Sequence, residues 1–196
     1  MDISSSSQQK FIEMASKAKN PMEKFDDSMK FEKDGQTFNL ICKSKCDVDP
    51  KILKWAFKLA ERNVGLYYKT CSMGWQPKIK QRDLNKNWAK YLIAFDKRKT
   101  PIAYSMFRFD HDYGKKVLYC YEMQIEQDFR RIGLGRFMMA ALEKCAEFWN
   151  MEKVVLTVLR NNYDAKAFFS KLDYKLDETS PDDNEKVDYE ILSKVL

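Results

Sequence analysis

Two glycines and three arginines stand close together in the middle of the chain, in the segment RRIGLGR at residues 130–136. This segment follows an apolar, aromatic stretch of strand length at residues 118–125, and it opens a run of helical apolar spacing that reaches residue 149. The first N–H groups of a helix have no partner within the helix, glycines let a ligand approach them, and arginines add positive charge. The segment is therefore predicted to bind phosphate groups.

This glycine loop (residues 130–136) differs from two common phosphate-binding motifs. The Gly-Lys-Ser/Thr of a Walker loop does not follow it. The third glycine and the later acidic residue of a dinucleotide-binding loop are also missing. What remains is Arg130-x-x-Gly133-x-Gly135, entered from a strand and opening a helix. By spacing alone, a structural turn and a ligand site explain this motif equally well.

Carboxylates near the aromatic strand are the second group of residues that could do chemistry. Glu122 lies within the strand, and a carboxylate in largely apolar surroundings can accept a proton. It can equally serve as a hydrogen-bond partner of neighbouring backbone. Asp110 and Asp112 are expected in a turn before the strand, where aspartate often bonds local backbone. Both interpretations of these residues are open at this point.

Composition excludes several functional classes. The 196 residues carry a formal net charge of +6 and are 44% hydrophobic, which is typical of a globular domain. The one histidine, His111, is expected in a polar turn, which argues against Ser-His-Asp or Cys-His catalysis. Five cysteines without framework spacing indicate free thiols and no metal site. Apolar runs are too short to cross a membrane, and no secretory signal is expected.

Apolar periodicity predicts a single α/β domain at residues 31–196, preceded by an N-terminal segment at residues 1–30. Residues 1–8 are expected to be loose, and residues 11–18 to form a short helix that ends before Pro21. The domain should contain strands at residues 38–42, 91–95, 102–109, 118–125, 153–159 and 187–192, and helices at residues 50–68, 78–85, 134–149 and 162–172.

The glycine loop in this setting resembles the acetyl-coenzyme A (acetyl-CoA) signature of the Gcn5-related N-acetyltransferase (GNAT) superfamily, Gln/Arg-x-x-Gly-x-Gly/Ala. The segment Asn162-x-x-Ala165-x-x-Phe168-Phe169 resembles the superfamily's second cofactor motif. Seven stretches in order resemble, more specifically, the NatD family of histone N-terminal acetyltransferases: YLIA at 91–94, FRFD at 107–110, VLYCYE at 117–122, RRIGLG at 130–135, LTV at 156–158, SP at 180–181 and YEIL at 189–192.

The resemblance implies a GNAT fold, which is a single α/β (α+β) domain whose central mixed, mostly antiparallel sheet is flanked by helices. It implies that acetyl-CoA is the co-substrate and that its acetyl group passes to the N-terminal serine amine of histones four and two-A, which begin Ser-Gly-Arg-Gly. It also implies histone N-terminal tails as partners, no need for nucleic acid or membrane, a monomer, and residence in the nucleus and the cytoplasm.

By the same resemblance, two sets of site residues are expected. The cofactor would contact Met123, Gln124, Ile125, Arg130, Arg131, Ile132, Gly133, Leu134, Gly135, Arg136, Thr157 and Asn162. The peptide would contact Tyr68, Asp110, Asp112, Tyr121, Glu122, Thr179 and Tyr189. Glu122 and Tyr121 are the candidate catalytic residues. The tyrosines would shape a pocket for a small first residue, and the carboxylates would pair with the α-ammonium and with the arginine at position three of the tail.

Some positions depart from the family pattern. Met73 stands where a tryptophan is expected at the peptide entrance, and Phe169 where many members have a tyrosine that can protonate the departing thiolate. Asp173 occupies a position that is often glycine, and a Ser/Gln start replaces a long basic leader. Three alternatives stay open: an acetyltransferase of lysine side chains or small amines, a nucleic-acid-binding module, and a catalytically inactive acyl-CoA-binding scaffold. Against the second, the arginines concentrate at one helix start.

Overall fold

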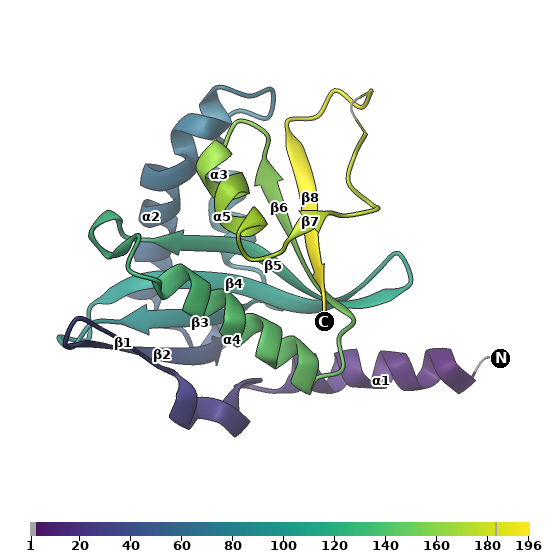
Figure 1. Ribbon diagram of the computed structural model, residues 1–196, viewed down its shortest axis with the longest axis horizontal. Coiled ribbons are helices and arrows are strands. Elements are labelled where there is room, and N and C mark those ends of the chain that lie inside the picture. The colour runs from purple at the N-terminus through teal and green to yellow at the C-terminus, as the bar shows by residue number, and fades with distance from the viewer. Residues whose placement is uncertain (1–2, 183) are drawn as a thin grey trace.

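The computed structural model describes residues 3–182 and 184–196 (Figure 1). One eight-stranded sheet has the strand order β1-β2-β3-β4-β5-β6-β8-β7. The strands are β1 (Lys30–Lys33), β2 (Gln36–Ser44), β3 (Lys90–Phe95), β4 (Pro101–Asp112), β5 (Lys115–Ile125), β6 (Lys153–Leu159), β7 (Lys175–Leu176) and β8 (Tyr189–Val195). The helices are α1 (Ile3–Lys17), α2 (Pro50–Lys69), α3 (Pro77–Leu84), α4 (Leu134–Phe148) and α5 (Tyr163–Ser170), with 3-10 turns at Glu23–Ser28, Lys45–Asp47 and Gln127–Phe129.

The predicted fold class, a mixed and mostly antiparallel sheet flanked by helices, is confirmed. Among the described strands, β5 and β6 are the parallel pair, and every other neighbouring pair is antiparallel. Parallel neighbours need a crossover connection, and α4 provides it. In Figure 1 this green helix crosses in front of the sheet. The crossover places the start of α4 at the end of β5, which is where the glycine loop lies.

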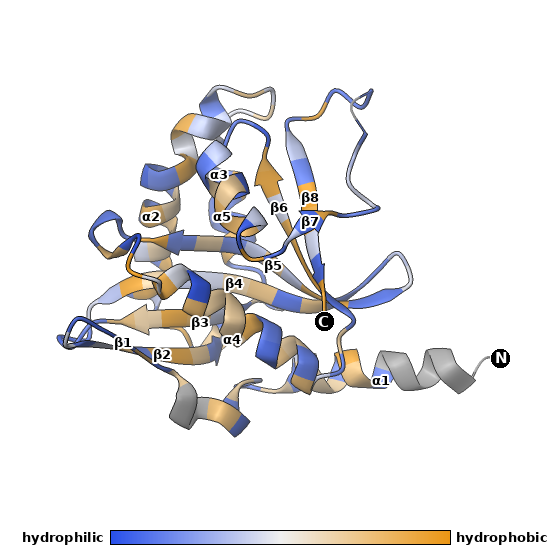
Figure 2. Ribbon diagram, viewed as in Figure 1, coloured by the Kyte–Doolittle hydropathy of each residue, from blue (hydrophilic) through white to orange (hydrophobic). Residues whose placement is uncertain are grey.

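Helices cover both faces of the sheet and create two cores. The larger core joins buried residues of α1, α4 and α5 to strand residues such as Phe38, Phe107 and Leu156. The smaller core joins α2 and Leu84 of α3 to strand residues of the opposite face, among them Tyr91 and Tyr104. Figure 2 shows hydrophobic colour along β3 and β6 and hydrophilic colour in most connecting loops. The two cores fix both faces of β4 and β5, the strands that carry most candidate site residues.

The hairpin between β4 and β5 differs from the prediction. His111 and both aspartates were expected in a turn, but the ladder continues to the pair Asp112 and Lys115. The turn consists of Tyr113 and Gly114, whose φ angles are 44° and 80°. Two consecutive positive φ values are typical of the tight turn that matches the twist of a hairpin. The aspartates and His111 are therefore strand residues, because the two-residue turn lets the ladder extend further than apolar alternation indicated.

The chain termini also differ from the prediction. Residues 3–8 were expected to be loose but belong to α1, while residues 1–2 lie outside the described residues. The buried Lys90 ammonium donates hydrogen bonds to the carbonyl oxygen of Ala18 and, at 2.8 Å, to Ser44 Oγ, and so ties the end of α1 to the sheet. Strand β1 was missed, and the last strand spans Tyr189–Val195 rather than residues 187–192. The domain boundary at residue 30 stays a prediction.

Within the described part of the chain, none of the helices has both the length and the apolar character needed to cross a bilayer. All five cysteines are free thiols. The described residues contain no group of three His, Cys, Asp or Glu side chains that could hold a metal ion.

Candidate active site: a glycine loop and an acceptor cleft

Two irregularities of β5 create the site. First, Met106 of β4 pairs with Glu122 and Phe107 pairs with Cys120, so Tyr121 is an extra residue in a β-bulge. Second, the parallel ladder between β5 and β6 ends at the pair Cys120 and Leu156. Beyond this point the two strands separate, and the backbone of β5 that would face β6 has no strand partner there among the described residues. Both candidate catalytic residues lie where the strands part.

The glycine loop has the backbone conformation that its sequence indicates. Arg131 and Gly133 have φ angles of 62° and 99°, and Gly133 is the residue that precedes the first turn of α4. Because Gly133 has no side chain, no side-chain oxygen caps the N–H groups of this turn. A Cβ at Gly135 would lie 3.1 Å from the Phe168 ring and 3.2 Å from Ile125 Cδ1, so glycine allows α4 to start tightly against β5 and α5.

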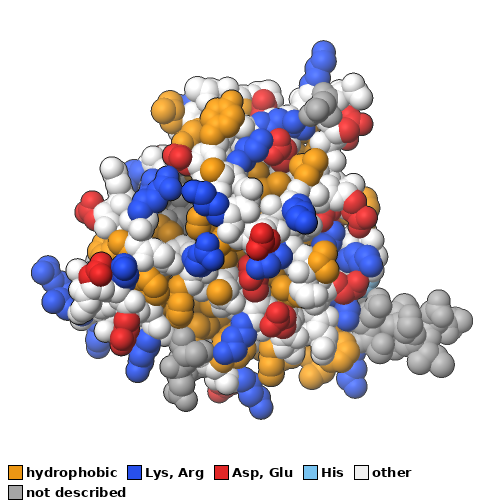
Figure 3. Space-filling view, viewed as in Figure 1, with side chains coloured by type: hydrophobic (Ala, Val, Ile, Leu, Met, Phe, Trp, Pro, Cys, Tyr) orange, Lys and Arg blue, Asp and Glu red, His pale blue; other side chains and the backbone are white. Residues whose placement is uncertain are grey.

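Positive charge surrounds this loop, although some of its arginines have protein partners. Arg130 donates through Nε to the carbonyl oxygen of Ile125 at 3.1 Å. Arg131 lies 3.6 Å from Asp164, and more than 80% of both side chains is exposed, so the pair is weakly held. Figure 3 shows Lys and Arg side chains gathered over α5 and the start of α4. The loop thus has the charge and the free backbone donors that an anionic ligand requires.

Several residues that were expected to contact the cofactor make hydrogen bonds within the protein. Asn162 caps α5, because its Oδ1 accepts a hydrogen bond from the Ala165 N–H at 3.2 Å. The Gln124 side chain is buried, and its Oε1 accepts from Asn63 Nδ2 at 2.9 Å. Thr157 Oγ1 lies 2.6 Å from the hydroxyl of Tyr119. These contacts fix the walls around the point where β5 and β6 separate.

A cleft of about 450 Å³ lies beside the bulge, on the sheet face that α2 and α3 cover. We call it the acceptor cleft; its lining residues are Tyr68, Lys80, Asp83, Leu84, Lys86, Trp88, Met106, Arg108, Tyr121, Glu122 and Thr157. Three predicted peptide-binding residues meet here: Tyr68 from α2, and Tyr121 and Glu122 from β5. Thr157, which was expected to contact the cofactor, also belongs to the lining. The cleft is aromatic on its sides and has the Glu122 carboxylate in its wall.

Glu122 is paired with a lysine. Lys80 Nζ lies 2.7 Å from Glu122 Oε2, and only 16% and 10% of the two side chains is exposed. The Lys80 ammonium also lies 3.5 Å from the Tyr68 hydroxyl and 5.0 Å above the centre of the Tyr68 ring. Burial alone would lower the pKa of Lys80, but the negative charge of Glu122 raises it above its usual value. The amine and the carboxylate therefore form a charged pair inside the cleft.

Arg108 forms the second charged group of the cleft. Its guanidinium lies 4.9 Å from the centre of the Trp88 ring and 5.2 Å from that of Tyr121, so it packs against two aromatic rings that also contact each other. Its other partner is the Asp110 carboxylate. Asp110 was expected to pair with an arginine of the peptide, and in this structure an arginine of the protein takes that position.

Of the remaining predicted peptide contacts, Thr179 and Asp112 lie near Asp177, whereas Tyr189 lies at the start of β8. Thr179 donates to Asp177 Oδ1 from its N–H at 2.9 Å and from its hydroxyl at 2.7 Å. Burial raises the pKa of Asp112, and the charge of Asp177 acts in the same direction. Tyr189 pairs with Leu159 at the start of β8. The described residues that line the acceptor cleft do not include Asp110, Asp112, Thr179 or Tyr189.

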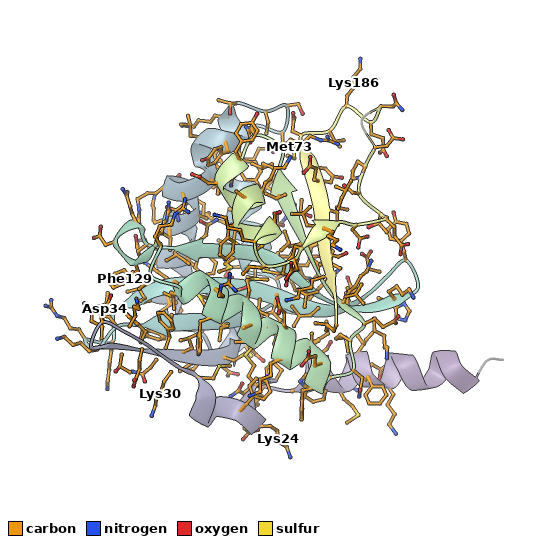
Figure 4. The ribbon with its side chains drawn as sticks, viewed as in Figure 1. Lys24, Lys30, Asp34, Met73, Phe129 and Lys186 are labelled. Carbon is orange, nitrogen blue, oxygen red and sulfur yellow. The ribbon has the colours of Figure 1, made fainter. Side chains whose placement is uncertain are left out.

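Two loops at the upper end of the molecule are joined to each other. Figure 4 shows Met73 in the loop after α2 and Lys186 in the loop that leads to β8, both at this end. The Ser72 N–H donates to Asp188 Oδ2 at 2.7 Å, and the Ser72 hydroxyl donates to the same oxygen. Met73, the residue that departs from the family pattern, therefore lies in a loop whose position depends on the chain before β8.

Sequence reasoning missed four residues of this region: Lys80, Trp88, Arg108 and Tyr119. Strand alternation could have found two of them, because Arg108 shares a face of β4 with Met106, and Tyr119 shares a face of β5 with Tyr121. The rings of Tyr119 and Tyr121 lie 4.5 Å apart. Lys80 gave no such signal, because it is one of several basic residues on a short helix.

The model of the acetyltransferase (GNAT) family matches residues 54–174 of the chain. This region contains most of α2, all of α3, strands β3–β6, the glycine loop and α5. It therefore includes the glycine loop and all the residues that line the acceptor cleft.

Solved structures of acetyltransferases share the fold. The NAA60 protein of Arabidopsis thaliana, solved with a bisubstrate analogue, is 10% identical with a TM-score of 0.58, and the match covers 81% of this chain and 99% of that one. Naa50 of the same plant, solved with the analogue CoA-Ac-MVNAL, is 17% identical with a TM-score of 0.54, covering 80% and 99%. The ribosomal-protein-S18-alanine N-acetyltransferase of Escherichia coli is 16% identical with a TM-score of 0.55, covering 80% and 93%.

Proposed function

The chain belongs to the GNAT acetyltransferase family, whose members use acetyl-CoA, and from this premise we propose that it acetylates the N-terminal serine amine of histones four and two-A. The observation that carries the proposal is the grouping of Tyr68, Tyr121 and Glu122 in one cleft beside the bulge of β5. An aromatic cleft with the Glu122 carboxylate beside the bulge suits a small first residue and its amine. The stretches that resemble the NatD family, which acts on tails beginning Ser-Gly-Arg-Gly, support this choice of substrate.

The residues of the glycine loop fit the phosphates of acetyl-CoA. The positive φ of Gly133 strains the backbone of any larger residue, the close contacts at Gly135 disfavour a side chain there, and the N–H groups of the first turn of α4 have no side-chain cap. Arg130, Arg131 and Arg136 supply the positive charge. The backbone of β5 after Cys120 would hold the extended arm of the cofactor, because the β6 ladder ends there.

Acetyl-CoA supplies an acetyl group for transfer: the amine nitrogen bonds to the carbonyl carbon, the carbon–sulfur bond breaks, and the proton lost by nitrogen finally reaches the released thiolate. Glu122 would orient the amine and accept its proton, directly or through water. Tyr121, at the bulge, would turn its ring toward the first residue of the tail. Backbone N–H groups at Met123 or Gln124 would donate to the oxygen that becomes negative during the reaction.

Two matched peptides that begin Ser-Gly-Arg-Gly test the proposal. The first has a free N-terminus and blocked lysines; the second has a blocked N-terminus and free lysines. With labelled acetyl-CoA, label is expected on the first peptide only. Label on the second peptide alone would overturn the proposal and reassign the enzyme to lysine side chains, and label on neither would reject this tail as a substrate.

The same proposal includes two further properties. The enzyme is expected to act as a monomer, which sedimentation at several concentrations tests. It is also expected in both the nucleus and the cytoplasm, where histone tails would meet it; imaging of the tagged full chain tests this, and restriction to another compartment would contradict it.

A further inference from the structure

The acceptor cleft contains a positive charge at the place where a substrate amine has to bind. Lys80 comes from α3, Glu122 from β5 and Tyr68 from α2, so three elements converge on this point. The contact of 2.7 Å between Lys80 Nζ and Glu122 Oε2 is largely shielded from solvent. A pair in this position differs from an exposed surface ion pair, because water and salt screen it much less.

The ionisable groups nearest to the Lys80–Glu122 pair are uncharged near neutral pH and add no charge to it. The neighbours with ionisable side chains are Tyr68 on α2, Tyr91 on β3, Tyr104 on β4 and Cys120 on β5, and burial raises the pKa of each. All four are therefore neutral. The other charged residues of the cleft are Asp83, Lys86 and Arg108. Asp83 lies 3.7 Å from Arg82, and Arg108 contacts Asp110.

We infer that Lys80 determines the charge state of the amine that this cleft accepts, because it neutralises Glu122 and so makes the site bind an uncharged amine. The inference rests on the proposed function only in that the acceptor is an amine entering this cleft. An ammonium ion placed beside Glu122 would also lie beside the Lys80 ammonium, and like charges at such a distance repel each other. An uncharged amine has no such cost and can still donate a hydrogen bond to Glu122.

The consequence is a preference for N-terminal amines. With a reference pKa near 8, about a tenth of an α-amine is uncharged at pH 7. With a reference pKa near 10.4, only about one lysine amine in 2,500 is uncharged. A site that accepts uncharged amines therefore favours the α-amine by about 200-fold before any contact with the rest of the peptide is counted. Lys80 is thus a specificity-determining residue.

The pH dependence of the reaction tests this role. In the wild type, kcat/KM for the free-N-terminus peptide should rise about tenfold per pH unit from pH 6 to the pKa of its amine. In Lys80→Met, the unpaired Glu122 should bind ammonium, so the rise should flatten and KM at pH 6 should fall about tenfold or more. The ratio of kcat/KM for the free-N-terminus peptide to that for the free-lysine peptide should shrink by a similar factor. Lys80→Arg should keep the wild-type profile, and Lys78→Met, an exposed lysine of the same helix, should change nothing.

Two outcomes would overturn the inference. One is a Lys80→Met enzyme that binds CoA normally and keeps the slope, the KM and the amine preference of the wild type. The other concerns the wild type alone and does not depend on the folding of a variant: calorimetry of the peptide with the enzyme–CoA complex should show binding about tenfold or more tighter at pH 9 than at pH 6. Equal or tighter binding at pH 6 would show that the site takes ammonium.

The labelling experiment with the two matched peptides distinguishes a failure of the proposed function from a failure of this inference. If the wild type labels only the free-lysine peptide, the proposed substrate is wrong, and the same pH series is run with that peptide. A rise of about tenfold per pH unit that flattens in Lys80→Met would then support the role of Lys80 for a different amine. A flat wild-type profile would overturn it.

Discussion

The glycine loop and the acceptor cleft handle charge in opposite ways. The loop is a continuous stretch of the chain whose backbone N–H groups and exposed arginines are available to an anion. The cleft is built from five elements, and each of its carboxylates has a basic side chain within 4 Å. The loop therefore attracts a ligand by positive charge, whereas the cleft presents carboxylates whose charge is already paired. The two halves of the site can be tested separately.

Loss of the glycine at the start of α4 should have the largest effect. Gly133→Trp places a bulky residue at a φ of 99° and within contact of Phe31, so the phosphate-binding backbone should be displaced. We expect CoA affinity to fall by about 100-fold or more in isothermal titration. Gly35→Trp is the matched control, because Gly35 also has a positive φ but has open space around it and lies in the β1–β2 turn. Unchanged CoA affinity in Gly133→Trp would reject the loop as the cofactor site.

Glu122→Gln should affect the cleft and leave the loop intact. Without a proton acceptor beside the amine, kcat is expected to fall by about 100-fold, while CoA affinity stays within about twofold of the wild type. Steady-state rates and calorimetry measure the two quantities. Glu126→Gln serves as the control, because Glu126 lies just after β5 but pairs with Arg62 and Trp55 outside the cleft. A full rate in Glu122→Gln would assign this carboxylate to structure alone.

Asp177→Asn should reduce stability, because it leaves the buried Lys153 without its partner at 2.6 Å. The expected loss is about 3 kcal/mol, or a fall of about 6–12 °C in Tm. Asp164→Asn, which alters only an exposed pair, should leave Tm unchanged. The peptide KM should rise in Asp177→Asn, since Asp177 also holds Thr179.

The contribution of Asp177 should also depend on pH. Burial alone would raise its pKa, but hydrogen bonds from Lys153, Ser193 and Thr179 lower it below the usual range. A carboxyl group whose pKa is lower in the folded state stabilises the protein above its unfolded pKa of about 4, and this stabilisation is lost as the pH falls below that value. The difference in Tm between wild type and Asp177→Asn should therefore shrink between pH 5 and about pH 3. A constant difference would contradict the assignment.

The smallest effect is expected at the joined loops. Asp188→Asn weakens the contact with Ser72, which is exposed to solvent. Because exposed contacts contribute little, we expect Tm to be unchanged and the peptide KM to rise by about twofold, through greater mobility of the Met73 loop. A rise in the KM for acetyl-CoA instead would place this contact on the cofactor side of the molecule.

The sequence by itself determined the elements whose signals are local. The glycine loop could be predicted because its strand, loop and helix follow one another along the chain. Glycine also tolerates the positive φ that Gly133 adopts, because it has no Cβ. The α4 helix and the mixed sheet could be predicted because apolar periodicity is also a local signal, which is read along one segment of the chain. The β4–β5 turn was misplaced because polar residues at a strand end resemble a turn in composition, although their backbone continues the ladder.

Only the tertiary structure decided whether the Glu122 carboxylate of the acceptor cleft is free or paired. The sequence indicated Glu122 as a carboxylate in an aromatic strand, but its partner Lys80 lies 42 residues earlier on a helix of another layer. Asp110 differs, because its partner Arg108 lies only two residues earlier on the same strand and could have been found from strand alternation. Whether a carboxylate is free or paired depends on distances of a few ångströms between elements, and these distances are set by how α2 and α3 pack on β4 and β5. Periodicity along one segment carries no information about that packing.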